Sequence, residues 1–134
     1  MCLPINKKQK PQIATEPIVC FKCLTVDLLS PCFSQKYELG EMLTSEFSIE
    51  TRNYCNTIEK GLHSYANESE AKYVAYNYTW FNQISGYNQK APVVVKCIIP
   101  KDATYYKAES MTSCVSYEYA SNQLIPVEIV EICQ

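Results

Sequence analysis

The chain has 134 residues, of which 47% are hydrophobic and 19% are charged, with a formal net charge of -2. This length and composition predict one globular domain with its own core. No apolar run approaches the roughly 18 residues of a membrane-spanning helix. A slightly acidic chain whose basic residues cluster only at Lys7, Lys8 and Lys10 is also a poor match for a phosphate backbone. We therefore expect no membrane and no nucleic-acid partner.

Residues 1–16 are predicted to form a flexible N-terminal arm. They contain Pro4, Pro11 and three lysines but few apolar side chains, a composition typical of extended or disordered termini. They also lack the apolar segment of a secretory signal. We therefore predict a cytoplasmic protein with a single domain over residues 17–134.

Short extended segments, separated by Pro, Gly and Asn, dominate this domain. The segments 18–26 and 93–99 are rich in β-branched residues and apolar on both faces, as in strands buried within a sheet. The segment 124–133 changes its alternation near its end, which indicates a β-bulge or burial on both faces. The other predicted strands are 33–39, 47–51, 61–66, 104–108 and 113–119. Two polar or aperiodic segments are predicted as loops: 53–60 and 80–91.

One helix is predicted, over about residues 68–79. Asn67 and Glu70 have the spacing of a capping box, in which the Asn side chain accepts a hydrogen bond from a free backbone N–H. Apolar residues then recur at helical spacing and predict a stripe that packs on a sheet: Ala71, Val74, Ala75 and Tyr78. Tyr73 and Tyr76 lie off this stripe, so they either pack on a second neighbour or remain exposed, and we predict a binding surface there.

These elements together predict an α+β fold, with a mixed or antiparallel sheet of six to eight short strands and one main helix. The strands do not alternate regularly with helices, so parallel β-α-β units are not expected. The sequence also shows no internal repeat and no low-complexity segment.

Eight cysteines raise the question of disulfides, but we expect reduced, buried thiols. No secretory signal is visible, and Cys20 and Cys97 lie in apolar strand-like runs, where a thiol packs as a small hydrophobic group. Cys20 and Cys23 have C-x-x-C spacing, yet a zinc site normally takes a second such pair. In a strand, these two sulfurs also point to opposite faces. We predict no metal site and no cofactor.

Five residues are candidates for ligand binding. His63, the only histidine, shares a strand face with Tyr65 just before the helix, although a half-buried histidine bonded to a carbonyl is the more common arrangement. Glu118 lies between two tyrosines with Gln123 shortly after it. A carboxylate in this place can bind a ribose hydroxyl or stabilise a developing positive charge, but more often it lies on a solvated strand face. Tyr76 completes the set, and no catalytic residue is predicted.

Four stretches resemble known proteins: MCLP, KGLHSYANESEA, VKCIIPKDATYY and SYEYASNQLIP. Together they resemble an uncharacterised family of small proteins from bacteriophages and gut bacteria. More distantly, residues 61–71 resemble the strand and helix of poly(ADP-ribose) polymerases and related ADP-ribosyltransferases, and Glu118, Tyr119 and Gln123 are similar to the late strand of that family. The resemblance implies an NAD-like cleft, with His63 at the nicotinamide end and Glu118 at the ribose. The early His-Gly pair of that family is absent, because His63 is the only histidine.

Three functions are consistent with these features. The first is a small phage or prophage-type domain that binds a nucleotide-derived ligand in a cleft and is not an intact enzyme. The second is a protein interaction module that antagonises a host factor or defence system, using the exposed tyrosines of the helix and the 80–91 loop. The third is an active ADP-ribosyltransferase.

Overall fold

The structure is a computed structural model that describes residues 3–5, 9–25, 27–29, 35–51, 56–85, 92–109 and 117–132, with the backbone alone for 78–85. Within these residues it contains eleven strands and one helix. The elements are β1 (Leu3–Ile5), β2 (Gln12–Ile13), β3 (Ile18–Thr25), β4 (Leu43–Thr44), β5 (Ser48–Thr51), β6 (Asn56–Lys60), β7 (Leu62–Tyr65), α1 (Glu68–Ser85), β8 (Pro92–Ile99), β9 (Thr104–Glu109), β10 (Tyr117–Ser121) and β11 (Gln123–Ile132). The predicted α+β class is confirmed, but the prediction of six to eight strands is too low.

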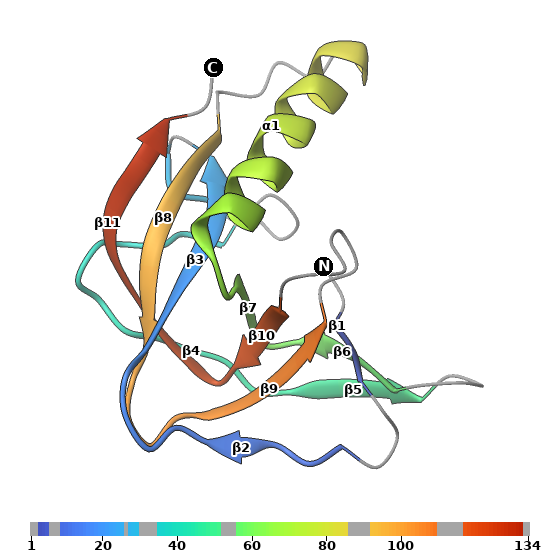
Figure 1. Cartoon of the computed structure of the whole chain (residues 1–134), viewed down its shortest axis with the longest axis vertical. Helices are drawn as coiled ribbons and strands as arrows, with labels where there is room; N and C mark the ends of the chain where they lie inside the picture. Colours follow the sequence, from blue (N-terminus) through green and yellow to red (C-terminus); the bar gives the residue numbers. More distant parts are fainter. Residues whose placement is uncertain are drawn as a thin grey trace.

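The strands form two antiparallel sheets (Figure 1). The larger sheet has eight strands in the order β2-β9-β10-β7-β3-β8-β11-β4, and the smaller has three in the order β1-β6-β5. In Figure 1, β3, β8 and β11 rise beside α1, whereas β2 and β9 lie across the lower end of the molecule. The predicted central strands 18–26 and 93–99 are the neighbours β3 and β8.

The two faces of the larger sheet have different covers. One face, here called the helix face, carries Phe21, Cys23 and Tyr65, which pack with Ala71 and Ala75 of α1. The smaller sheet covers the same face at β9 and β10, where the buried residues are Leu3, Ile5, Ile58, Tyr106 and Ala120. The opposite face carries most of the core. Its fully buried side chains are Cys20, Leu24, Leu62, Val93, Val95, Cys97, Ile99 and Leu124, together with Tyr37 from the segment after β3.

The helix begins where the sequence predicts and ends later. The Glu70 backbone N–H donates to Asn67 Oδ1 over 2.8 Å, which satisfies one of the free donors of the first turn. Ala71 and Ala75 are fully buried, as the predicted stripe requires. The helix continues to Ser85 rather than ending near 79, because no Gly or Pro interrupts the sequence before Gly86. Residues 80–85 of the predicted loop are therefore helical, and 86–91 lie outside the described residues.

The segment expected as a flexible arm contributes two strands to the sheets. β1 pairs with β6, with Leu3 opposite Ile58, and β2 pairs with β9. Leu3 and Ile5 are buried on either side of Pro4, so burial of two alternating apolar side chains attaches this segment to the smaller sheet. Strands of two or three residues are too short to show a period in the sequence, which is why β1, β2 and β4 were not predicted.

Four further segments differ from the predictions or test them. Residues 56–60, predicted as loop, form β6, because its polar sequence still buries Thr57 and Ile58 against neighbouring elements. The predicted strand 33–39 has no strand in its described part, only an isolated bridge between Leu29 and Lys36. The change of alternation in the last strand, predicted as a β-bulge or burial on both faces, coincides with shifts of the β8–β11 register at two places. β10 begins at Tyr117, and residues 113–116 lie outside the described residues.

Candidate functional site

Three candidate residues lie together on the helix face of β7 and β10. These strands are antiparallel neighbours, with Glu118 directly opposite Tyr65 and Ala120 directly opposite His63. Directly opposed residues of an antiparallel pair point to the same face, as do residues two apart in one strand. His63, Tyr65 and Glu118 therefore share one face on two adjacent strands. The sequence predicted the first pair from alternation, but only the strand order shows that Glu118 joins it.

This cluster lies where the two covers of the helix face meet. Tyr65 packs with Ala71 and Ala75 of α1, whereas Ala120, opposite His63, packs with Leu3 and Ile58 of the smaller sheet. Figure 1 shows β7 and β10 between α1 and β6. Tyr65 is only 3% exposed and Glu118 only 4%, so these two side chains are enclosed. A ligand can reach these two side chains only if the groups that enclose them move.

His63 contains an unsatisfied polar atom in this enclosed place. Its side chain is partly buried, and its Nε2 is buried with no hydrogen-bond partner among the described residues. Burial, followed by the positive charge of Lys22, lowers the pKa of His63 from 6.5 to about 3, and Glu59 opposes this shift. The imidazole is therefore neutral at pH 7. A buried polar atom without a partner destabilises the fold, and a bound hydrogen-bonding group would remove that cost.

The opposite face behind this cluster has polar groups that the sequence analysis did not select. The Lys22 side chain is buried, and its Nζ donates to the backbone oxygen of His63 over 2.6 Å. The same Nζ lies 5.2 Å from the centre of the Tyr37 ring, within range of a cation–π contact. Lys22 thus supports the β7 backbone at His63 from behind. Its position as the only charge in segment 18–26 was the available signal.

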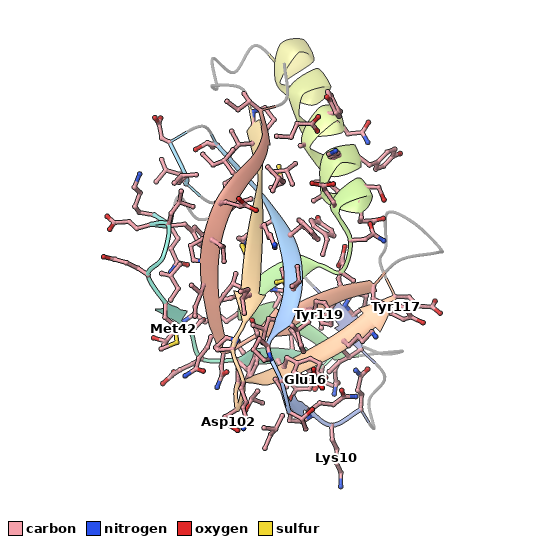
Figure 2. The ribbon with its side chains drawn as sticks, turned by 60° about the vertical axis from the view of Figure 1, so that its left-hand side comes forward. Lys10, Glu16, Met42, Asp102, Tyr117 and Tyr119 are labelled. Carbon is pink, nitrogen blue, oxygen red and sulfur yellow. The ribbon has the colours of Figure 1, made fainter. Side chains whose placement is uncertain are left out.

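Ser64 and Tyr119 lie beside Lys22 on this opposite face. They are directly opposite one another in the β7–β10 pair, and burial raises the pKa of the Tyr119 phenol. Burial also raises the pKa of Cys20 to about 11, although the nearby Ser64 hydroxyl and Lys22 lower it in part. In Figure 2, Tyr119 lies within the body of the molecule, whereas Tyr117 points outward at its rim. The Cys20 thiol and the Tyr119 phenol are therefore both uncharged at neutral pH.

Two candidate residues lie outside the cluster. Tyr76 is 49% exposed on α1, away from the stripe that packs on Tyr65. Gln123 begins β11 and pairs with Thr44 of β4. It lies beyond the far end of β10 from Glu118, in a polar pocket of about 310 Å³ lined by Thr44, Ser45, Glu46, Asn122 and Gln123. The structure therefore does not bring either residue to His63.

The described residues contain no group of three or more His, Cys, Asp or Glu side chains arranged to hold a metal ion. Cys20 and Cys23 lie on opposite faces of β3, in different core clusters, so the C-x-x-C pair does not converge. Among the described residues, no helix is both long and apolar enough to span a membrane.

Comparison of the chain with protein-family models, curated protein sequences and solved structures found no match. The expected likeness to the ADP-ribosyltransferase fold therefore has no support from these comparisons.

Proposed function

We propose that this chain is a binding domain for a nucleotide-derived small molecule, held at the face shared by His63, Tyr65 and Glu118. The register that sets Glu118 opposite Tyr65, beside His63, is the observation that carries the proposal. A tyrosine ring stacks on a base or nicotinamide ring, a neutral imidazole donates or accepts a hydrogen bond, and a carboxylate binds ribose hydroxyls. The Nε2 of His63, which has no hydrogen-bond partner within the part of the chain that the structure describes, is the atom expected to gain one.

Ligand entry requires the two covers of the helix face to separate. α1 rests on β3, β7 and β8, whereas β1 of the smaller sheet rests on β9 and β10. Because the two covers rest on different strands of the larger sheet, we infer that they can separate near His63 without breaking that sheet. Ligands that bind such a state shift the population toward it.

Isothermal titration with NAD, ADP-ribose and cyclic nucleotides tests this proposal. We expect heat with at least one of them, and a loss of about tenfold or more in affinity for His63→Ala and Glu118→Gln, since loss of a hydrogen bond to a charged or buried group costs about 1.5–3 kcal/mol. Gln123→Ala is the matched control, because Gln123 lies in a different pocket. Absence of heat with every ligand contradicts the site. A loss of ligand affinity in Gln123→Ala that His63→Ala and Glu118→Gln do not show also contradicts it.

A protein interaction module is the second candidate, and the exposed tyrosines of α1 favour it. Tyr73 is 57% and Tyr76 49% exposed on the helix, as their positions off the apolar stripe predicted. Tyrosine is enriched at protein interfaces, where its ring provides apolar contact area and its hydroxyl a hydrogen bond. The partner class proposed is a host factor or defence protein.

Affinity capture from host lysate with a double variant, Tyr73→Ala and Tyr76→Ala, tests this surface. Ile49→Ala is the matched control, because Ile49 is similarly exposed on β5 of the smaller sheet. We expect the double variant to lose the captured partner and the control to keep it. Retention of the partner by the double variant excludes the α1 surface.

An active ADP-ribosyltransferase is the third candidate and rests on the sequence resemblance alone. It predicts transfer of label from NAD to a target protein and loss of the transfer in Glu118→Gln. A cytoplasmic location likewise stays a prediction, which cell fractionation tests.

A further inference from the structure

Two cysteines face one another across the centre of the larger sheet. Cys20 of β3 is directly opposite Cys97 of β8 in the antiparallel register, and both side chains are fully buried in the core of the opposite face. Both are free thiols. The pKa of Cys97 is raised first by burial and then by the presence of Cys20, as expected for two sulfurs lying close together.

We propose that Cys20 and Cys97 are a modification site, at which a reversible cross-strand disulfide forms with a low-molecular-weight disulfide as oxidant. Directly opposed residues of antiparallel strands have Cα atoms about 4.5–5.5 Å apart. Disulfides form at Cα separations of about 4.4–6.8 Å, so the backbone already has the required spacing. The side chains also share one face of the sheet.

The reaction balances with glutathione disulfide as the oxidant. The Cys20 thiolate attacks one sulfur of glutathione disulfide, which forms a mixed disulfide and releases one glutathione thiolate. The Cys97 thiolate then attacks the Cys20 sulfur, which forms the protein disulfide and releases the second glutathione. The two protons lost by the cysteines are taken up by the two glutathione thiolates. The protein is oxidised by two electrons and the glutathione disulfide is reduced by two.

Burial makes this exchange slow in the closed protein. Thiolates are the reacting species, and enclosure raises the pKa of both thiols. The reaction therefore proceeds during local opening of the β3–β8 pair or during folding. Once formed, the bond joins the two strands on which α1 rests and closes a loop that contains β4, β5, β6, β7 and α1. This constrains the unfolded chain and stabilises the oxidised form.

Peptide mapping of the full chain tests the proposal. The protein is incubated or refolded with glutathione disulfide, free thiols are alkylated, and the digest is analysed by mass spectrometry. Trypsin cuts after Lys22 and so separates Cys20 from Cys23, whereas cuts after Lys96 and Lys101 release Cys97 in a short peptide. We expect one linked pair that joins the Cys20 and Cys97 peptides, with a mass lower by two hydrogen atoms.

Variants then test the specificity of the bond. Cys20→Ala and Cys97→Ala are expected to abolish the linked pair, and also the rise in melting temperature on oxidation. Cys23→Ala is the matched control, because Cys23 lies in the same strand but packs toward α1. Linkage of Cys20 to any other cysteine overturns the proposal. The proposal is also overturned if Cys20 and Cys97 are both fully alkylated after refolding with the oxidant, because both thiols have then stayed reduced. The wild-type map decides the pairing even if a variant fails to fold.

Discussion

His63 connects the candidate site to the acid stability of the fold. The pKa of the folded imidazole is about 3, against 6.5 for its ordinary value, because burial and then the charge of Lys22 disfavour the protonated form. Between these two values the unfolded state binds a proton that the folded state does not. The contribution of the neutral His63 to stability is therefore fully present above pH 6.5, and it is lost as the pH falls toward 3.

Replacement of His63 by Gln is expected to reduce this acid sensitivity. Glutamine cannot take up a proton, so the variant should lose less stability than the wild type, by up to about 1.4 kcal/mol for each pH unit below 6.5. Urea unfolding of both proteins from pH 7 to pH 4 measures the difference. The contributions of the acidic side chains to the pH dependence are the same in both proteins, so they cancel in the comparison. If the free energy of unfolding falls equally with pH in both proteins, His63 has its ordinary pKa and the expectation is wrong.

Gly61 allows the tight connection between β6 and β7 that places His63. Its φ is +143°, and a Cβ at this position would lie 3.2 Å from Cδ1 of the Phe47 ring. Gly61→Ala is expected to destabilise the fold by about 1–3 kcal/mol, from backbone strain and crowding. Gly40→Ala is the matched control, because Gly40 has φ +84° but nothing within 4 Å of the added Cβ. Equal losses in urea unfolding would show that the Phe47 contact is irrelevant.

At the scale of elements, α1 depends on its N-terminal cap. The Asn67 side chain accepts hydrogen bonds from the Glu70 backbone N–H and from the Ser69 hydroxyl, at 2.8 and 3.0 Å. Two acidic residues, Glu68 and Glu70, also lie in the first turn, where they interact favourably with the helix dipole. The start of α1 is therefore determined locally.

Asn67→Ala is expected to cost about 1 kcal/mol, the usual value for loss of an N-cap side chain. Asn77→Ala provides the control. Asn77 lies within the helix, exposed, and its Nδ2 donates to the Tyr73 carbonyl, so the gain in helix propensity offsets the lost hydrogen bond. Thermal and urea unfolding followed by circular dichroism compare the two. A larger loss for Asn77→Ala would contradict the assigned cap.

The whole molecule depends on contacts between segments far apart in the sequence. The smaller sheet joins residues 3–5 with 48–51 and 56–60, and it packs on β9 and β10 of the larger sheet. Leu3, Ile58 and Tyr106 meet in this layer, although they come from three distant parts of the chain. The N-terminal segment therefore belongs to the folded domain at β1.

Leu3→Ala tests this conclusion. Leu3 is fully buried, and removal of a buried leucine side chain costs about 2–5 kcal/mol. Ile13→Ala, in β2 of the same N-terminal segment, is the control, because Ile13 is 65% exposed. Urea unfolding should show a large loss for the first variant and less than about 0.5 kcal/mol for the second. Similar values would mean that β1 is not part of the stable core.

The sequence by itself determined the features that depend on neighbours along the chain. These are the capping of α1 by Asn67, the burial of Ala71 and Ala75, the two apolar central strands, the irregular last strand and the shared face of His63 and Tyr65. Each follows from a helical or strand period, or from a cap, that involves only a few adjacent residues. The end of the helix was missed, since sequence signals for its end are weaker than those for its start.

Only the tertiary structure decided which strands become neighbours. It joined Glu118 to His63 and Tyr65, placed Gln123 in another pocket, set Cys20 opposite Cys97 and incorporated β1 into a second sheet. It also enclosed Tyr65 and Glu118 under covers that no local pattern indicated. The physical reason is that strand order depends on the burial of side chains from distant segments in a common core, which local periodicity does not record.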